Sequence, residues 1–170
     1  EQGAKLFGCD LDEAAVARAR GELGLEAVKA DEIFDVDCDV FAPCALGAIL
    51  NDRTIPRLRC KIVAGAANNQ LADPDRDGSA LAARGILYAP DFVINAGGLI
   101  NVYSELTGYN KERALRMARG IYENTLRVFE IAQRGQVPTY VAADRLAEER
   151  IAQVRKMRPA YWDRNLLARR

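Results

Sequence analysis

Short apolar runs alternate with amphipathic stretches over the first two-thirds of the chain. Five such runs are bounded by polar residues or glycine, a pattern typical of buried parallel strands. They cover residues 5–9, 26–29, 38–42, 61–66 and 86–88. Amphipathic spacing over residues 12–23 and 79–84 predicts helices between them. Strands that alternate with helices predict an α/β fold, with a doubly wound, mostly parallel sheet covered on both faces.

After Gly97 and Gly98 the pattern becomes helical. The spacing predicts helices over residues 99–106 and 111–133, and a last helix from Pro138 or Thr139 to residue 156. We therefore expect an α/β domain over residues 1–108, followed by a helical extension over residues 109–170.

The charges of the chain balance, with 24 Lys and Arg residues against 24 Asp and Glu residues. A balanced chain has no overall field that would attract nucleic acid or an anionic membrane. The apolar runs are too short to span a bilayer and no signal segment opens the chain, so we expect a cytoplasmic protein. The tail after Arg155 carries arginines around Tyr161 and Trp162, which we interpret as a docked or frayed terminus.

The chain contains no histidine, which excludes the Ser-His-Asp and Cys-His nucleophile arrangements. Its cysteines form no C-x-x-C pair, so we predict no metal site. We expect all four to be small, buried, reduced residues. They are Cys9, Cys38, Cys44 and Cys60.

The stretch YAPDFVINAGGLINV, residues 88–102, sets two amides among apolar side chains. Asn95 and Asn101 would be costly to bury unless they were hydrogen-bonded. Gly97 and Gly98 mark a place where the backbone bends sharply or where another molecule approaches closely. Together these features predict a polar ligand held against an apolar wall.

Asp10 ends the first predicted strand. Dinucleotide-binding folds carry an acidic residue at such a strand end, where it accepts hydrogen bonds from the adenosine ribose. Its charge would repel the 2′-phosphate of NADP, so Asp10 indicates NAD; equally, Asp10 or Asp12 could simply cap the next helix. The glycine-rich phosphate turn expected before the aspartate is absent. We therefore expect an incomplete Rossmann-type sheet, in a chain that begins inside the fold and lacks its first strand and this turn.

Two further strand ends carry ligand candidates, since ligands of open parallel sheets bind beyond the carboxyl ends of the strands. Asn68 and Asn69 follow residues 61–66, and their amides can donate and accept as the carboxamide of nicotinamide requires. An Asn-rich turn would give the same pattern. The small residues after Pro43 could line a cofactor crevice, although an ordinary strand-to-helix turn would look the same.

Four segments, in this order, resemble the Glu/Leu/Phe/Val amino-acid dehydrogenase family, and its leucine enzymes in particular. They are FAPCALGAILND (residues 41–52), AGAANNQLADP (64–74), YAPDFVINAGGLINV (88–102) and YVAADRLAEERI (140–151). The similarity corresponds to the carboxyl-terminal, NAD-binding half of those enzymes. It implies that residues 1–108 form a partial Rossmann domain, and that residues 109–170 pack on it and on a missing amino-terminal domain or a neighbouring subunit.

The resemblance implies roles for individual cofactor-binding residues. Asp10 matches the family's ribose-binding aspartate, and Cys44 and Ala45 match the turn near the nicotinamide ribose. Asn69, with Asn68 beside it, matches the asparagine placed between nicotinamide and substrate.

Leu99 and Val102 match positions that, with Asn69, form the pocket for the substrate side chain. Leucine enzymes usually carry a smaller valine where this chain has Leu99, whereas phenylalanine enzymes can carry leucine. The resemblance therefore implies reversible oxidative deamination of L-leucine or a related branched-chain amino acid, with valine and phenylalanine enzymes as alternatives.

The family's catalytic groups are two lysines and an aspartate of the amino-terminal domain, and no lysine of this chain stands in a matching context. We therefore expect no catalytic residue here and no activity of the segment alone. The family also implies an amino-acid substrate and a homo-oligomer. An alternative of another class is a non-catalytic assembly module, in which the helices over residues 111–133 and 139–156 pack against other copies.

Overall fold

The computed structural model describes the backbone of residues 3–166 and the side chains of residues 3–156, so the side chains of the basic, aromatic tail lie outside the described residues. The chain forms two compact units, Glu1–Asn95 and Ala96–Arg170. The sequence predicted a boundary after residue 108. The units divide earlier because the first helix after Ala96 packs against the next helix and so belongs to the second unit.

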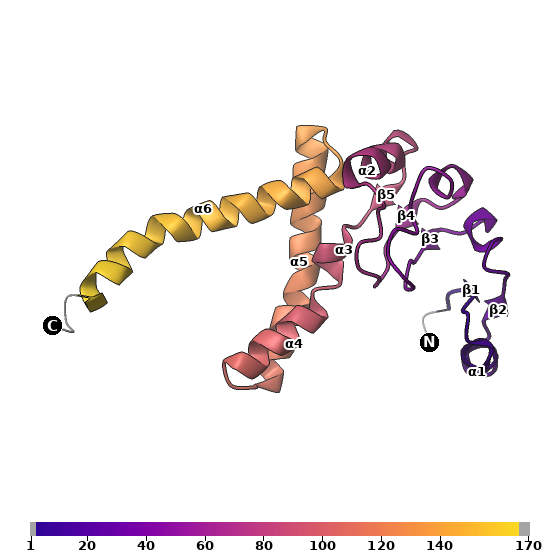
Figure 1. The fold of residues 1–170 in the computed structure, drawn as a ribbon, viewed down its shortest axis with the longest axis horizontal. Coiled ribbons are helices and arrows are strands. Elements are labelled where there is room, and N and C mark those ends of the chain that lie inside the picture. The colour runs from indigo at the N-terminus through magenta and orange to yellow at the C-terminus, as the bar shows by residue number, and fades with distance from the viewer. Residues whose placement is uncertain (1–2, 167–170) are drawn as a thin grey trace. The chain divides into compact units, whose positions relative to one another are not determined.

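The first unit contains two small parallel sheets (Figure 1). In one, β1 (Phe7–Gly8) pairs with β2 (Glu26–Ala27). In the other, β4 (Ile62–Val63) lies between β3 (Val40–Phe41) and β5 (Leu87–Tyr88). Every one of these strands lies inside a predicted run but is shorter than that run. The α/β class and the parallel pairing predicted from the sequence are confirmed.

Helices connect these strands, and local side-chain signals explain where they begin. α1 (Glu13–Leu23) starts after Asp12, whose side chain accepts the backbone N–H of Ala14. α2 (Pro74–Ala83) starts before the predicted residue 79 because Asp73 caps it and Pro74 occupies its first turn. The remaining elements of the unit are short: η1 (Ile33–Asp35), η2 (Ile55–Arg57) and α3 (Asp91–Ile94).

One face of the three-stranded sheet carries the core of the first unit. Phe41, Val63 and Tyr88 are aligned across β3, β4 and β5, and all three are buried. The next row, on the opposite face, contains Val40 and Leu87, which are 48% and 39% exposed. The sequence predicted cover on both faces. In the structure one row is buried and the other is partly open. The prediction differed because an apolar run does not show by itself how many faces of its strand are covered.

The second unit consists of α4 (Gly97–Leu106), α5 (Lys111–Gly135) and α6 (Thr139–Leu166). Both α4 and α6 pack against α5. The last predicted helix was expected to end at residue 156, whereas α6 continues to Leu166, as Figure 1 shows in yellow. Among the described helices, none combines the length and the hydropathy that crossing a bilayer would need.

Candidate cofactor site

Two loops interlock at the carboxyl ends of β3 and β4. The carbonyl oxygen of Pro43, which follows β3, accepts the backbone N–H of Ala67, which follows β4, at 2.9 Å. Gly65 packs directly on the same proline. A Cβ added to Gly65 would lie 2.1 Å from the Pro43 carbonyl oxygen, so only glycine fits there without moving the backbone.

The two loops meet again at Ala48 and Asn69. The N–H of Ala48 donates to the carbonyl oxygen of Asn69 at 2.7 Å. Both residues have left-handed backbone angles, with φ of 59° and 51°. Such an angle is costly for alanine and better tolerated by asparagine, and non-glycine residues in this conformation cluster at ligand sites.

This interlocking brings together two of the predicted groups of cofactor residues. Cys44 and Ala45 lie on the first loop, and Asn68 and Asn69 lie on the second. All four residues are exposed. The loops therefore present two amides and two small side chains to any molecule that binds at this edge of the sheet.

The segment after β5 joins the same edge through Asn95. Its side-chain N–H group donates to Oδ1 of Asn68 at 2.5 Å. Asn95 is half-buried, so the sequence correctly indicated a hydrogen-bonded amide here. Asn101 was expected to be similar, and that expectation is wrong. It is exposed on α4 and bonds to Glu105 one turn away.

α3 is anchored to the end of β5 by a buried hydroxyl–carboxylate pair. The Tyr88 hydroxyl donates to Oδ1 of Asp91 at 2.9 Å. Both side chains are buried. Burial raises the pKa of Tyr88 well above its usual value, so the phenol keeps its proton and remains a donor.

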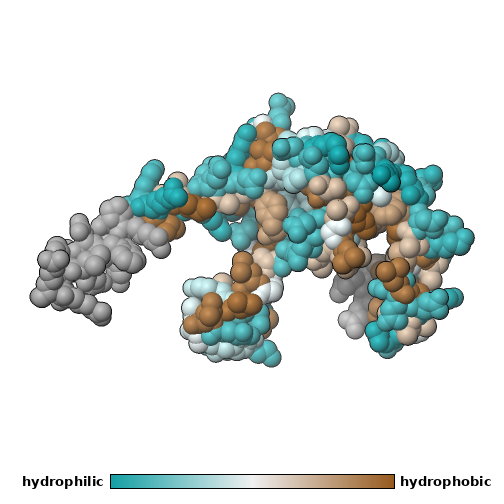
Figure 2. All heavy atoms as spheres, viewed as in Figure 1, coloured by the Kyte–Doolittle hydropathy of each residue, from teal (hydrophilic) through white to brown (hydrophobic). Residues whose placement is uncertain are grey.

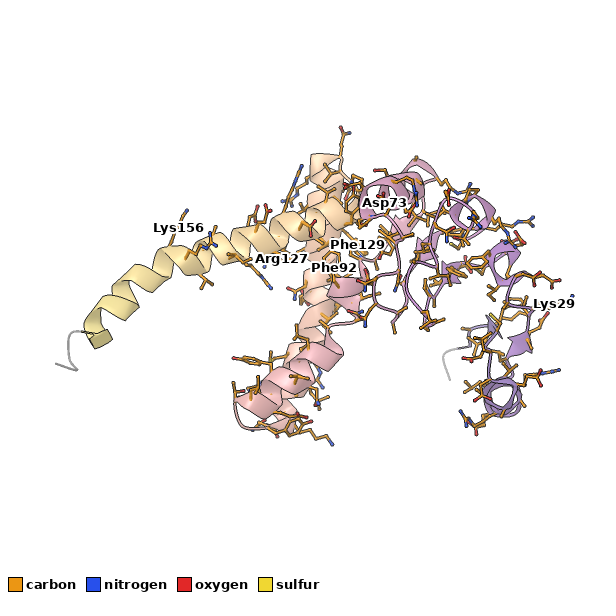
Figure 3. All side chains as sticks on the ribbon, in the orientation of Figure 1. Lys29, Asp73, Phe92, Arg127, Phe129 and Lys156 are labelled. Atoms are coloured by element: carbon orange, nitrogen blue, oxygen red, sulfur yellow. The ribbon has the colours of Figure 1, made fainter. Side chains whose placement is uncertain are left out.

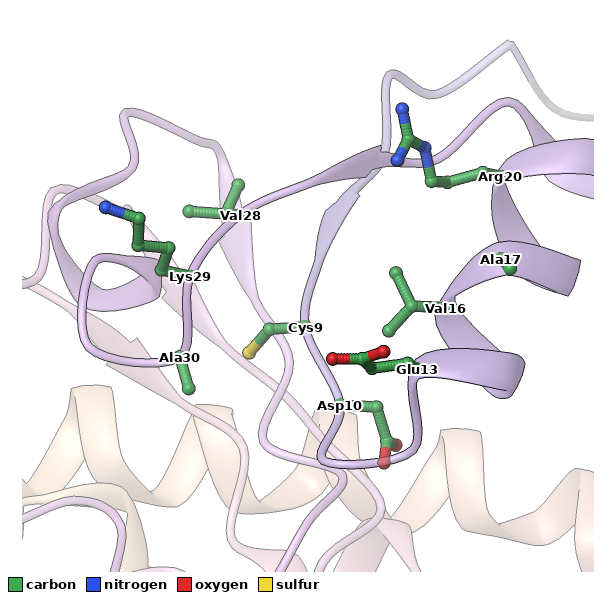
Figure 4. Close-up of a pocket in the computed structure, with 9 residues that line it drawn as sticks. All are labelled: Cys9, Asp10, Glu13, Val16, Ala17, Arg20, Val28, Lys29 and Ala30. Carbon is green, nitrogen blue, oxygen red and sulfur yellow. The ribbon is translucent and has the colours of Figure 1, made fainter.

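Asp10 lies in a separate cleft of about 480 Å³ between α1 and the ends of β1 and β2. Figure 4 shows Asp10 and Arg20 at opposite ends of this cleft, with Cys9 and Lys29 also lining it. Asp10 accepts the backbone N–H of Asp12 at 2.9 Å. Because Asp12 is the residue that caps α1, the helix-capping alternative holds for Asp12, whereas Asp10 shapes the turn before the helix.

Charges of both signs surround the cleft. Asp10 and Glu13 contribute carboxylates, and Arg20 and Lys29 contribute cations. Lys29 lies at the outer edge of the first unit in Figure 3, where its Nζ pairs with Glu32 at 3.2 Å.

The cysteines correct one expectation, because two of them are exposed. Cys9 and Cys44 are exposed, Cys38 is half-buried and Cys60 is buried; all four thiols are free. Cys9 and Cys44 follow strand ends, where the chain leaves the core for the open edge of the sheet. Although Cys9 is exposed, partial desolvation of its thiol and the neighbouring Asp10 raise its pKa, which keeps it protonated. Within the described residues, no three His, Cys, Asp or Glu side chains gather as a metal site would require.

The predicted substrate residues lie on α4, in the second unit. Leu99 and Val102 are 73% and 53% exposed, and Tyr103 and Leu106 continue the same helical face. Apolar side chains of α4 are visible at the surface as brown spheres in Figure 2. We name Leu99, Val102, Tyr103 and Leu106 the α4 stripe.

Gly97 and Gly98 were expected to form a bend or to allow close approach. They form the first turn of α4, and the turn in the chain lies just before them at Asn95 and Ala96. Apart from the adjacent residues and the backbone of α4 itself, no described atom lies within 4 Å of a Cβ added at either glycine. The bend therefore lies two residues before the predicted position, and the side of α4 where Gly97 and Gly98 lack a side chain is open.

Three residues that line the cleft or support the loops were not among the predicted site residues. Arg20 and Lys29 line the Asp10 cleft, yet each appears in the sequence as an ordinary charged surface residue. Gln70 is fully buried behind Asn69. Its only signal was its position directly after two asparagines at a strand end.

Comparison with known proteins gives one family. The model of the glutamate/leucine/phenylalanine/valine dehydrogenase family matches residues 8–158. Leucine dehydrogenase from Thermoactinomyces intermedius is 56% identical over 168 residues, which are 98% of this chain and 46% of that protein. Phenylalanine dehydrogenase from Caldalkalibacillus thermarum is 45% identical, over 89% of this chain and 42% of that protein.

A solved structure is also similar over most of the chain. The crystal structure of L-tryptophan dehydrogenase from Nostoc punctiforme superimposes with a TM-score of 0.86 at 50% identity. The match covers 88% of this chain and 45% of that one. The chain therefore spans about half the length of the relatives that it matches.

Proposed function

The chain belongs to the glutamate/leucine/phenylalanine/valine dehydrogenase family, as its sequence predicted, and on that premise we propose that it forms the NAD-binding part of an L-amino-acid dehydrogenase. The proposed reaction is the reversible oxidative deamination of L-leucine or a related branched-chain amino acid to the 2-oxo acid, ammonia and NADH. The observation that carries the proposal is the interlocked pair of loops at the ends of β3 and β4, which presents Asn68 and Asn69 beside Cys44 and Ala45.

Asp10 supports NAD as the cofactor. Its carboxylate stands at the carboxyl end of β1 in an open cleft, where it would accept hydrogen bonds from ribose hydroxyls and repel a 2′-phosphate. Arg20 and Lys29 line the same cleft and would favour a phosphate. Lys29 is already paired with Glu32, and Arg20 lies at the opposite end of the cleft from Asp10, so we expect the carboxylate to decide the preference.

The interlocked loops suit the nicotinamide end of the cofactor, which when bound accepts the hydride from the substrate. The small side chain of Ala45 lets a ligand come close to the backbone. The Asn69 amide has both donors and an acceptor, so it can orient a carboxamide and a substrate amino group together. Asn95 holds the neighbouring Asn68 amide in place.

The strand order supports a Rossmann-type sheet interrupted at its centre. In the usual order, 3-2-1-4-5-6, the first strand lies between the two halves of the sheet. The orders β1-β2 and β3-β4-β5 match those two halves. We therefore propose that the first strand and its glycine-rich turn are supplied by the part of the whole protein outside these 170 residues.

The proposed substrate rests on the α4 stripe and on the relatives. Leu99 and Val102 form an apolar surface suited to a branched side chain. The similarity to leucine dehydrogenase supports L-leucine as the substrate. The similarity to phenylalanine and tryptophan dehydrogenases makes a larger amino acid one alternative, and L-valine is another.

We also propose that the protein is a homo-oligomer. Apolar side chains on the outer faces of the second unit support this, and they are the same surfaces that a non-catalytic assembly module would use. They are Leu115, Tyr122 and Leu126 on α5, and Ile151 and Val154 on α6. A cytoplasmic location stays a prediction.

The test is NADH formation by the whole protein with L-leucine, L-valine, L-phenylalanine and L-tryptophan, each with NAD⁺ and with NADP⁺. We expect the highest kcat/KM with L-leucine and NAD⁺, and no turnover by the 170-residue segment alone. Absence of turnover with all four amino acids would remove the dehydrogenase proposal. If the whole protein had no domain that carries the family's catalytic lysines, the non-catalytic assembly module would be the remaining hypothesis.

A further inference from the structure

Gln70 directly follows the two exposed asparagines in the chain, and its amide is fully buried. Its Nε2 donates to the carbonyl oxygens of Gly65 at 2.8 Å and Ala67 at 3.0 Å. Its Oε1 is buried and has no hydrogen-bond partner among the described residues. One half of the amide is thus fully used, and the other half is unsatisfied.

This asymmetry indicates what the residue contributes. A methionine of similar length would fill the same space without burying an unpaired oxygen, which is unfavourable in a protein interior. The specific contribution of glutamine is therefore its two N–H donors. They hold the carbonyl groups of Gly65 and Ala67, the two residues by which this loop packs on Pro43.

The contact to Ala67 encloses a short piece of chain. Only Asn68 and Asn69 stand between Ala67 and Gln70, so the side chain closes a small ring around them. The backbone of Gln70 also accepts the N–H of Leu50 at 2.9 Å, next to the bond between Ala48 and Asn69. Gln70 therefore fixes both ends of the strained turn that exposes Asn69.

We propose that Gln70 is the positioning residue of the cofactor-binding loops. Gln70 does not touch the cofactor. It holds Asn68 and Asn69 in the arrangement that binds the cofactor, and through the bond between Asn69 and Ala48 it also holds the loop that carries Ala45. The proposal rests on the proposed function, because it takes these loops as the nicotinamide site.

The test uses the whole enzyme and the variant Gln70→Met, which keeps the size of the side chain and removes the donors. Ile55→Val is the matched control, because Ile55 is a 2% exposed residue of the hydrophobic core of the first unit and lies outside both loops. Two measurements are made: amide hydrogen exchange of Ala48 and Ala67 in the cofactor-free protein, and NADH affinity by fluorescence titration.

We expect exchange at both amides to be about tenfold faster in Gln70→Met, because the loop that carries the Ala67 N–H and the Asn69 carbonyl oxygen is no longer held by the side chain of residue 70. NADH affinity should fall by about fivefold or more, which corresponds to the loss of one hydrogen bond. Ile55→Val should change neither quantity beyond its effect on global stability. Wild-type exchange and affinity in Gln70→Met would overturn the proposal.

Gln70→Glu gives a second test that does not depend on the methionine variant folding. A neutral carboxyl can still donate one hydrogen bond to these carbonyls, whereas a carboxylate can donate none. Since burial raises the pKa of a carboxyl group, NADH affinity of this variant should fall as the pH rises through the neutral range, while that of the wild type does not. An identical pH profile for the two proteins would contradict the positioning role.

The two proposals fail in different ways. If the wild-type enzyme binds neither NADH nor NADPH, the proposed function is wrong. The exchange rates of Ala48 and Ala67 in the cofactor-free variants would still decide whether Gln70 holds the loops.

Discussion

The backbone N–H of Ala48 donates to the carbonyl oxygen of Asn69 at 2.7 Å, and both residues are held in left-handed conformations. This bond joins the loop after β3 to the loop after β4. It fixes the position of Asn69 at the edge of the sheet. Gly47 allows this close approach because it has no Cβ; an added Cβ would lie 2.9 Å from the carbonyl oxygens of Asn68 and Asn69.

Gly65→Ala should destabilise the protein. The added Cβ would lie 2.1 Å from the Pro43 carbonyl oxygen, a backbone atom that cannot rotate away. We expect a loss of about 1–3 kcal/mol in the free energy of unfolding, measured by urea denaturation. Gly120→Ala is the control, because Gly120 lies inside α5 with no atom within 4 Å of an added Cβ. It should be neutral or stabilising by up to about 1 kcal/mol; equal losses in the two variants would contradict the close packing on Pro43.

Asn69→Gly should lower kcat/KM of the whole enzyme without unfolding it. Glycine tolerates the φ of 51° and removes only the amide. We expect a loss of about tenfold or more in steady-state assays, which matches one or two lost hydrogen bonds. Asn69→Leu should lose as much activity and some stability besides, because a leucine at this φ is strained. Unchanged kinetics in the glycine variant would show that Asn69 is an ordinary turn residue.

Asp10→Ala should weaken NAD⁺ binding by about tenfold or more, since hydrogen bonds to a charged group contribute about 1.5–3 kcal/mol. Discrimination against NADP⁺ should fall at the same time, because the repulsion of the 2′-phosphate is removed. Isothermal titration with both cofactors measures the two effects. Glu22→Gln, on α1 but not in the lining of the cleft, is the control and should change neither. Equal use of both cofactors by the wild-type enzyme would count against the role of Asp10.

Asp77 should make the stability of the protein depend on acid pH. Burial raises the pKa of this carboxyl, but hydrogen bonds from Arg76 and from the backbone N–H of Asp73, which lies at the start of α2 in Figure 3, hold it below the usual value. A lowered pKa contributes stability above the unfolded-state value of about 4, and this contribution disappears as the pH falls through the folded-state value.

The measurement is the urea midpoint between about pH 6 and pH 3 for the wild type and for Asp77→Asn. The variant should be less stable near neutral pH by about 1.5–3 kcal/mol and should show a flatter acid profile. Asp35→Asn is the control. Hydrogen bonding to Arg57 lowers the pKa of Asp35, but the pair is exposed and screened by water, so its removal should have little effect. Parallel acid profiles for wild type and Asp77→Asn would exclude this role.

Local signals in the sequence were sufficient for most of the secondary structure. The α1 helix was predicted from an acidic start and from Gly24, and the structure places its cap at Asp12 and a left-handed Gly24 at its end. α2 was predicted too short because it was inferred from the spacing over residues 79–84 alone, and its start signal, Asp73 followed by Pro74, lies before that stretch. Capping and periodicity depend on residues a few positions apart, so they can be found without a tertiary structure.

Exposure was harder to predict, because it depends on what other parts of the chain cover. Cys9 and Cys44 were expected to be buried and are exposed, and Asn101 was expected in an apolar wall and lies on an open helix face. Gln70 shows the opposite case, a polar side chain that the tertiary structure buries completely.

The family, the α/β class and the residues at the strand ends could be predicted from the amino-acid sequence alone. How those residues meet depends on the folded arrangement of the strands. Ala48 and Asn69 are 21 positions apart in the chain (69 − 48), and their bond forms because parallel strands bring their carboxyl ends to one edge of the sheet. The two donors of Gln70 acquire their role there, since only the folded loop places the carbonyls of Gly65 and Ala67 within their reach.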